Sequence, residues 1–368
     1  MGAAGSGARS GPSPRAAVAA IEPYVPGAVP SAVQRALRLA SNENPFGPSP
    51  LAVAAARAVL DGVNRYPEAG APTLRAKLAA RHGVAPDQIV VGAGSDETLY
   101  LLANTYLEPG RHALMADPAY GIHRISARAA GATVAQVRAP GGVHDLPAMA
   151  AVARAAGAPG VLYVANPHNP TGTVVAVDAI AALLDGVPAD WLVVVDEAYV
   201  DFVEPALRST ALDLLGRHPG LVVTRTFSKA YGLAGMRVGY AVASAEVLEP
   251  IGRIRPPFNV SAPTLAAAAA ALDDEAHLAR TVRDTLASRT ALCTGLTSLG
   301  LRWLPSQANF VLVEDRDDWP AGLAAEAIAV RPGANLSVPG WTRISLPRPQ
   351  DVDRVVGVIG RTLEEARA

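Results

Sequence analysis

The stretch Thr226-Phe-Ser-Lys-Ala-Tyr-Gly-Leu-Ala-Gly-Met-Arg237 places Lys229 beside a hydroxyl and eight residues before an arginine, in an apolar segment punctuated by glycine. A lysine whose ammonium is desolvated or crowded by another cation becomes an amine nucleophile. Ser228 and Arg237 are suitable ligands for a phosphate ester. A site for pyridoxal phosphate requires a reactive lysine beside a phosphate-binding site. Taken alone, the same stretch would also fit an exposed lysine at the start of a loop.

Composition limits the class of protein. The chain has 368 residues, of which 50% are hydrophobic and 18% charged, so it is long enough for one large domain and a smaller one. Its 32 basic and 33 acidic residues give a net charge of −1, which excludes a strong field for nucleic acid or an anionic membrane. The single cysteine, Cys293, excludes an intramolecular disulfide and a cysteine-based metal cluster, and we expect no metal.

The first twenty residues are rich in Gly, Ser, Pro and Ala and contain no continuous apolar core of signal-peptide length. We expect residues 1–20 to form a disordered tail. No run of about 18 uninterrupted apolar residues follows, so the sequence predicts no membrane span. The predicted location is the cytoplasm.

The chain after Asn44 alternates between short apolar runs and helical patterns. The apolar runs, most of them rich in β-branched residues, are Ile89–Val91, Ala113–Met115, Val161–Val164, Trp191–Val195 and Leu221–Thr224. This alternation predicts an α/β fold with a mostly parallel sheet covered on both faces. We expect a large domain over residues 46–258, a smaller α+β domain over 259–368, and an N-terminal arm over 21–45.

Polar residues follow the strand ends, where such sheets place their chemistry. Gly92-Ala-Gly-Ser95-Asp96 opens a helix whose free amides would attract phosphate, although an ordinary capped helix starts in the same way. Tyr120, held by a preceding proline, is suited to stack on a flat ring or to lie in a surface turn. Asn169 could donate a hydrogen bond to a phenolic oxygen, and His168 beside it is an alternative candidate for a catalytic base.

A carboxylate, Asp196, stands at the end of a very apolar strand, where a charge is costly unless a partner compensates it. A pyridinium nitrogen is such a partner, and the carboxylate would keep that nitrogen protonated. The competing interpretation is a magnesium site completed by Asp201 and Glu204. Near the C-terminus, Arg331 and Arg343 lie at strand ends, where they would bind a carboxylate or phosphate or form surface ion pairs.

The order of these segments resembles the class I and II aminotransferases, which are fold-type I enzymes dependent on pyridoxal phosphate. Within them, it is most similar to the histidinol-phosphate aminotransferases and their relatives that act on aromatic amino acids. The resemblance extends from about Tyr24 to the C-terminus and rests on Leu39-Ala-Ser-Asn-Glu-Asn-Pro-Phe-Gly47, Asn64-Arg-Tyr-Pro-Glu68, Asn169-Pro-Thr-Gly172, Asp196-Glu-Ala-Tyr199 and the stretch from Thr226 to Arg237. It implies a homodimeric fold-type I transferase with an N-terminal arm.

The resemblance also implies roles around the cofactor ring. Lys229 would bond to the cofactor and later move the substrate proton. Asp196 would pair with the pyridine nitrogen, and Asn169 and Tyr199 would hydrogen-bond the phenolic oxygen. Tyr120 would stack on the ring face.

Further roles concern the cofactor phosphate and the substrate. The phosphate cup would use Ser95, Asp96, Thr226 or Ser228, and Arg237. In this family the tyrosine matching Tyr66 reaches the phosphate from the neighbouring subunit. Substrate binding would fall to Tyr24, Asn44, Arg331 and Arg343, with Arg343 on the amino acid's carboxylate and Arg331 and Tyr24 on a substrate phosphate.

The implied reaction moves an amino group between glutamate and an oxo substrate, with histidinol phosphate and imidazole acetol phosphate of histidine biosynthesis as the expected amino and oxo compounds. An aromatic amino acid, an intermediate of specialised metabolism, or decarboxylation of a phosphorylated amino acid are the alternatives. Phe258, Pro347 and His168 depart from residues common in relatives and bear on substrate choice. We do not expect a transcription regulator, because the residues before Tyr24 show no helix-turn-helix pattern and no basic excess. We do not expect a dehydrogenase or kinase, because the sequence lacks their phosphate-loop motifs.

Overall fold

The computed structural model describes residues 12–27, 36–316 and 318–366. Most of the predicted tail, residues 1–11, lies outside the described residues. Ala16–Ala19, which we expected within that tail, form the short helix α1, and Arg15 just before it donates a 2.8 Å hydrogen bond to the carbonyl of Ala129. The prediction of disorder is therefore wrong for this turn.

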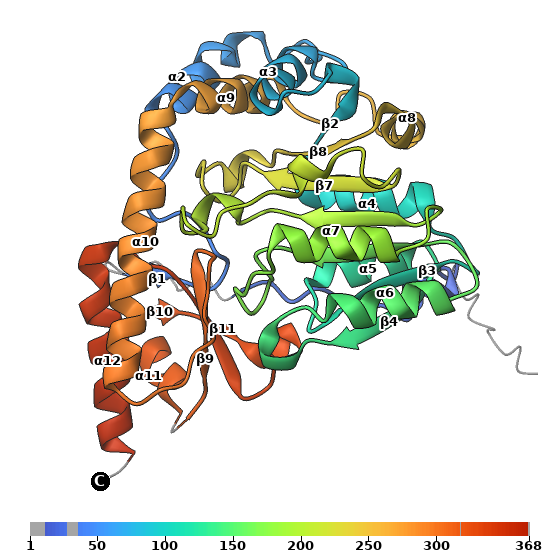
Figure 1. Ribbon diagram of the computed structural model, residues 1–368. Coiled ribbons are helices and arrows are strands. Elements are labelled where there is room, and N and C mark those ends of the chain that lie inside the picture. The colour runs from blue at the N-terminus through green and yellow to red at the C-terminus, as the bar shows by residue number, and fades with distance from the viewer. Residues whose placement is uncertain (1–11, 28–35, 317, 367–368) are drawn as a thin grey trace, which may run out of the picture.

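Helices and strands alternate through most of the chain (Figure 1). The remaining α-helices are α2 (Pro50–Ala58), α3 (Pro72–His82), α4 (Ser95–Tyr106), α5 (Gly121–Ala129), α6 (Leu146–Ala155), α7 (Val177–Gly186), α8 (Ala245–Ile254), α9 (Ala262–Asp273), α10 (Glu275–Ser298), α11 (Trp319–Ala325) and α12 (Val352–Glu365). The strands are β1 (Leu37–Arg38), β2 (Ile89–Gly92), β3 (His112–Asp117), β4 (Thr133–Arg138), β5 (Gly160–Ala165), β6 (Leu192–Asp196), β7 (Leu221–Thr226), β8 (Gly239–Ala243), β9 (Phe310–Glu314), β10 (Ile328–Ala329), β11 (Arg331–Pro332) and β12 (Trp341–Ser345).

The central sheet has seven strands in the order β2-β8-β7-β6-β5-β3-β4. Every strand runs in one direction except β8, which is antiparallel to both of its neighbours. The predicted mostly parallel sheet is therefore confirmed. Strand β4 was not predicted, because this edge strand is only half-buried and lacks a continuous apolar run. Strand β8, which follows the lysine stretch directly, was not predicted either.

Both faces of this sheet are covered, since successive strand residues point to opposite sides. Val161 and Tyr163 of β5 pack in one core with α4, α5 and α8. Leu162 and Val164 pack in another core with α6 and α7 (Figure 1). Burial on both sides explains why these strands read as unbroken apolar runs.

The smaller domain combines β9, β11 and β12 with α10, α11 and α12 around its own core. Strand β1 of the N-terminal arm pairs with β10, so the arm packs on this domain, and Leu39 joins its core. Helix α9 lies instead against α2, and its Leu265 shares a core with the large domain (Figure 1). We therefore place the boundary at the start of α10, later than the predicted residue 258.

Across residues 12–27, 36–316 and 318–366, no helix combines the length and the apolar character needed to cross a membrane.

Candidate active site

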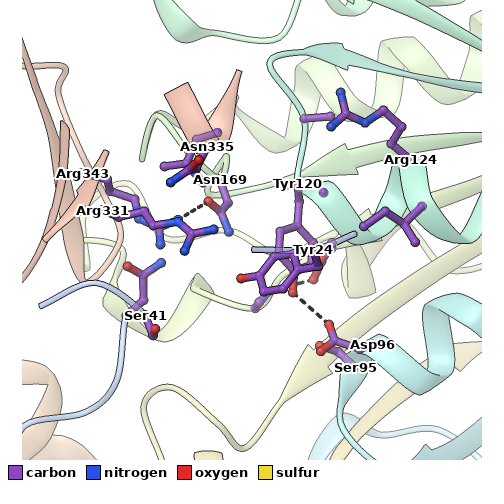
Figure 2. Close-up of a pocket in the computed structure, with 18 of the residues that line it drawn as sticks. Tyr24, Ser41, Ser95, Asp96, Tyr120, Arg124, Asn169, Arg331, Asn335 and Arg343 are labelled. Atoms are coloured by element: carbon purple, nitrogen blue, oxygen red, sulfur yellow. Dashed lines mark hydrogen bonds between the residues drawn. The ribbon is translucent and has the colours of Figure 1, made fainter. Parts of the chain in front are cut away.

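A cavity of about 610 Å³ opens at the carboxyl ends of the central strands, between the large sheet, the smaller domain and the N-terminal arm. Its lining includes every predicted site residue except Tyr66 and Asn44. Figure 2 labels seven of them, namely Tyr24, Ser95, Asp96, Tyr120, Asn169, Arg331 and Arg343. The predicted residues that line it are Tyr24, Ser95, Asp96, Tyr120, Asn169, Asp196, Tyr199, Thr226, Ser228, Lys229, Arg237, Arg331 and Arg343. The fold therefore gathers residues from segments that are far apart in the sequence, as expected for an α/β sheet with its site at the carboxyl ends of the strands.

Lys229 follows β7 and projects into the cavity. Its Nζ donates a 3.2 Å hydrogen bond to the carbonyl of Ser41 and lies 5.6 Å from the centre of the Tyr199 ring. Burial lowers the pKa of this amine to about 8, and the positive charges of Arg343 and Arg237 act in the same direction. A larger share of Lys229 is therefore neutral near pH 7 to 8 than of an ordinary lysine, as a nucleophile requires.

Asp196 ends β6 with its carboxylate buried beneath the cavity. One oxygen, Oδ1, accepts hydrogen bonds of 3.1 Å from Thr224 Oγ1 and 3.2 Å from the amide of Ala198. The other, Oδ2, lies 3.3 Å from Nε2 of His123. Three partners from three different segments therefore fix the orientation of this carboxylate.

His123 is a site residue that the sequence analysis missed. It lies on α5, is buried, stacks on Tyr163 with ring centres 4.7 Å apart, and meets Tyr120 edge-on at 5.5 Å. It sits one helical turn after Tyr120, on the buried side of an amphipathic helix. A single histidine on the buried face of a helix is usually a structural core residue. Only the contact with Asp196, which the sequence does not reveal, marks His123 as part of the site.

Tyr199 holds its hydroxyl between two amide groups. Nδ2 of Asn42 donates to it at 2.9 Å, and Nδ2 of Asn169 donates at 3.3 Å. Burial raises the pKa of Tyr199 to about 12, so the phenol keeps its proton and can act as a donor. Asn42 was not predicted, although it lies within the segment Leu39–Gly47 on which the family resemblance rests.

Tyr120, Asp96 and Arg237 form a chain of polar contacts on the other side of the cavity. The Tyr120 hydroxyl donates to Asp96 Oδ1 at 2.9 Å (Figure 2), and Arg237 Nη2 donates to Asp96 Oδ2 at 3.2 Å. Burial is the main reason that the pKa of Tyr120 is raised well above its usual value. Arg237 also reaches Ser228 Oγ at 3.5 Å, so it connects the start of α4 with the lysine loop.

Two glycines allow neighbouring groups to lie very close to the backbone at the start of α4. Gly94 has φ +86°, and a Cβ there would overlap the Arg237 guanidinium. A Cβ at Gly239 would overlap the backbone nitrogen of Ser95. The first backbone amides of a helix have no partner within the helix, so this tight turn offers donors suited to a phosphate.

Two buried arginines face the cavity from the smaller domain (Figure 2). Arg331 and Arg343 are direct cross-strand partners on β11 and β12. Arg331 donates at 2.5 Å to the carbonyl of Val25 and lies 5.5 Å from the centre of the Tyr24 ring. Arg343 donates from Nη1 to Asn169 Oδ1 at 2.7 Å, while its buried Nε has no partner among the described residues.

His168 does not line the cavity, so the alternative of a catalytic base finds no support. Its Nε2 lies 3.0 Å from the carbonyl of Pro118, and its Nδ1 lies 3.0 Å from both the Gly142 carbonyl and Thr171 Oγ1. Burial lowers the pKa of His168 to about 4. The neutral ring therefore connects the Asn169 loop to the loop that ends in Tyr120.

The magnesium alternative also finds no support. Asp201 and Glu204 lie outside the cavity, and Glu204 pairs with Arg289 at 3.2 Å. Within the described ranges, no group of three His, Cys, Asp or Glu side chains is placed to hold a metal.

Two predicted residues lie elsewhere. Asn44 donates from Nδ2 to the carbonyls of Lys229 and Ala230, both at 3.1 Å, so it supports the lysine loop and does not face the cavity. Tyr66 is 82% exposed and stacks on Phe258 with ring centres 4.5 Å apart. Neither residue lines the cavity.

Comparison with known proteins identifies the family. The model of the aminotransferase class I and II family matches residues 34–359. The chain belongs to the class I and II aminotransferases. This aminotransferase is 43% identical to histidinol-phosphate aminotransferase 2 of Pseudomonas aeruginosa over 93% of its own length and 95% of that protein. It is 42% identical to histidinol-phosphate aminotransferase of Symbiobacterium thermophilum over 96% of this chain and 99% of that one.

A solved structure agrees with these relatives. Histidinol-phosphate aminotransferase from Sinorhizobium meliloti, in complex with pyridoxal-5'-phosphate, superimposes with a TM-score of 0.82 at 27% identity, over 89% of this chain and 91% of that one. The fold-type I assignment is confirmed, and pyridoxal phosphate is the cofactor of this aminotransferase. The residues present fit that group: a lysine with a lowered pKa, an oriented carboxylate, and a glycine-lined helix start beside an arginine.

Proposed function

We propose that this aminotransferase moves an amino group between glutamate and a phosphorylated oxo substrate, with histidinol phosphate and imidazole acetol phosphate as the amino and oxo partners in histidine biosynthesis. The observation that carries the proposal is the pair Arg331 and Arg343, cross-strand partners that face the cavity. Two guanidinium groups suit substrates with strong negative charge, either the two carboxylates of glutamate or a phosphate monoester. The names of the relatives supply the specific substrate.

The cavity residues have distinct proposed tasks toward the cofactor. When bound, pyridoxal phosphate withdraws electrons from the substrate carbon that loses its proton. Lys229 holds the cofactor and, once free, carries that proton as general base and acid. Asp196 pairs with the ring nitrogen, the hydroxyl of Tyr199 and the amide of Asn169 contact the phenolic oxygen, and Tyr120 covers one ring face.

The proposed phosphate seat lies at the start of α4. The backbone amides of Ser95 and Asp96 and the side chains of Thr226, Ser228 and Arg237 would hold the cofactor phosphate. The packing at this turn supports the proposal, because the Arg237 guanidinium lies against Gly94 and the backbone nitrogen of Ser95 lies against Gly239, where a Cβ would overlap them. The Tyr120–Asp96–Arg237 contacts would keep the seat aligned with the ring.

A panel of half-reactions tests the proposed substrate. The purified enzyme, loaded with pyridoxal phosphate, is mixed with one amino compound at a time, and the loss of the aldehyde absorbance is followed. We expect L-glutamate and L-histidinol phosphate to convert the cofactor fastest. Faster conversion by phenylalanine would overturn the proposal in favour of an aromatic aminotransferase. Release of carbon dioxide from O-phosphothreonine without an oxo acid would favour a decarboxylase.

We further propose that the enzyme is a cytoplasmic homodimer in which Tyr66 completes the partner's site. The exposure of Tyr66, its stacking on Phe258 and its position outside its own cavity support this arrangement. Hybrids of a Lys229→Ala chain and a Tyr66→Ala chain provide the test. If Tyr66 serves the partner's site, each hybrid dimer has one intact site and one with both changes. Activity should then exceed that of either parent dimer, whereas a simple average of the parents would contradict the shared site.

A further inference from the structure

Two arginines that the sequence analysis did not single out line the wall of the cavity. Arg124 and Arg128 lie on α5, four residues apart, and therefore on the same face of this helix. Arg124 is half-buried and Arg128 is exposed, so the pair extends from the wall to the rim. In Figure 2, Arg124 lies across Tyr24 from Arg331 and Arg343.

These two side chains differ from the other arginines that line the cavity in the contacts they make. Within the part of the chain that the structure describes, neither guanidinium makes a hydrogen bond or an ion pair. Arg237, by contrast, pairs with Asp96, and Arg343 donates to Asn169.

The acidic residues of the lining do not neutralise the pair. Asp96 is bound to Arg237 and Tyr120, Asp196 is held beneath the cavity, and Glu43 pairs with Arg38. Glu22 on the N-terminal arm also lines the cavity, and no contact joins it to either arginine within residues 12–27, 36–316 and 318–366.

Two unpaired arginines on one helix face lower the stability of the helix but attract anions. Like charges four residues apart on a helix face repel each other and destabilise the helix. Positive charges on the wall of a concave site concentrate the potential there and raise the local concentration of anions. Guanidinium forks match phosphate and carboxylate groups in geometry.

We propose that Arg124 and Arg128 form an anion-capture subsite at the mouth of the cavity, which first binds the distal anionic group of the substrate. The ligand class is a phosphate monoester or a side-chain carboxylate. This inference rests on the proposed function for the identity of the phosphate ester. The subsite acts on the arrival of the substrate, while Arg331 and Arg343 hold it in the reacting position.

The test compares substrates with and without the distal anion in the double variant R124Q/R128Q. The second-order rate constant kcat/KM of the half-reaction is measured for L-histidinol phosphate and for L-histidinol, at low and at high ionic strength. We expect the ratio of the two constants to fall about tenfold at low salt and to fall much less at high salt, since salt screens steering. An unchanged ratio, or one that changes equally at both salt concentrations, would overturn the proposal.

A matched control removes two charges elsewhere on the large domain. Arg154 of α6 and Arg253 of α8 are exposed and do not line the cavity, so R154Q/R253Q should leave the ratio unchanged. A parallel ratio, L-glutamate against L-norvaline, distinguishes a side-chain carboxylate from a phosphate. If the wild-type enzyme does not use histidinol phosphate, the proposed function fails, and the glutamate ratio alone decides the subsite.

Discussion

Arg343 and Asn169 lie 174 residues apart in the chain and belong to different domains, yet Nη1 of Arg343 donates a 2.7 Å hydrogen bond to Oδ1 of Asn169. The amide of Asn169 in turn donates to the Tyr199 hydroxyl at 3.3 Å. The group proposed to bind the substrate anion is therefore connected to the groups proposed to hold the cofactor ring. A change at Arg343 should affect both binding and alignment.

Replacement of Arg343 by Gln should lower kcat/KM for glutamate by about a hundredfold or more, because loss of a buried charged partner costs about 2–5 kcal/mol. Arg343→Lys should recover little, since a lysine cannot form the guanidinium fork. Half-reaction kinetics with glutamate measure the effect. Arg302→Gln provides the control, because Arg302 is exposed in the same domain. Equal losses in Arg343→Gln and Arg302→Gln would contradict the role.

Replacement of Lys229 by Ala should abolish transamination, with a loss greater than about a thousandfold. The sequence contains only two lysines, Lys77 and Lys229, which makes the attachment site easy to locate. Borohydride treatment of the wild-type enzyme should add the reduced cofactor to the Lys229 peptide alone, as measured by mass spectrometry. Lys77→Ala should retain both activity and labelling. A normally active Lys229→Ala enzyme would disprove the assignment.

The lowered pKa of Lys229 predicts how cofactor capture depends on pH. Only the neutral amine attacks the aldehyde, and the neutral fraction rises with pH through the pKa of about 8. The rate at which cofactor-free enzyme captures pyridoxal phosphate should therefore rise between about pH 7 and 9 and then level off. Removal of the Arg343 charge should move the midpoint upward, because that charge lowers the pKa of Lys229. A rate that continues to rise past pH 10 would indicate an ordinary lysine.

Asp196 and His123 should differ in importance. Asp196→Asn keeps the shape but removes the charge, so kcat should fall by about a hundredfold or more, as for other groups that stabilise developing charge. His123→Phe keeps an aromatic ring against Tyr163 and removes only the contact to Asp196 Oδ2, so the loss should be about tenfold. Rates and thermal melting, measured together, separate catalysis from stability. A larger loss of kcat in His123→Phe than in Asp196→Asn would contradict the prediction that Asp196 is the more important of the two.

The lowered pKa of His168 predicts that the stability of the protein depends on pH. Its pKa is about 4 in the folded protein and about 6.5 in an unfolded chain, so the unfolded state binds more protons between these values. Its contribution to stability is therefore complete above about pH 6.5 and is lost as the pH falls toward 4. In His168→Asn, the free energy of unfolding should decline less over this range, as chemical denaturation at several pH values would measure. An unchanged pH profile would exclude this contribution.

Much of the site was predictable because its residues follow apolar runs. A parallel sheet buried on both faces requires such runs, and their carboxyl ends meet at one edge. Asp196, Asn169 and Tyr120 could be assigned on this ground, and Lys229 on its local setting. The magnesium and catalytic-base alternatives needed spatial information, since Asp201, Glu204 and His168 lie close to site residues in sequence but outside the cavity.

The sequence by itself determined the mostly parallel sheet and placed Lys229 and the carboxylate of Asp196 after two of its strands, because periodicity and position along a strand are local properties. Only the tertiary structure decided which neighbours those groups have. It placed His123 against Asp196 and Asn42 on Tyr199, and it turned Asn44 toward the backbone of the lysine loop. These contacts join residues separated by 73 to 185 positions, and no local pattern encodes such a pairing.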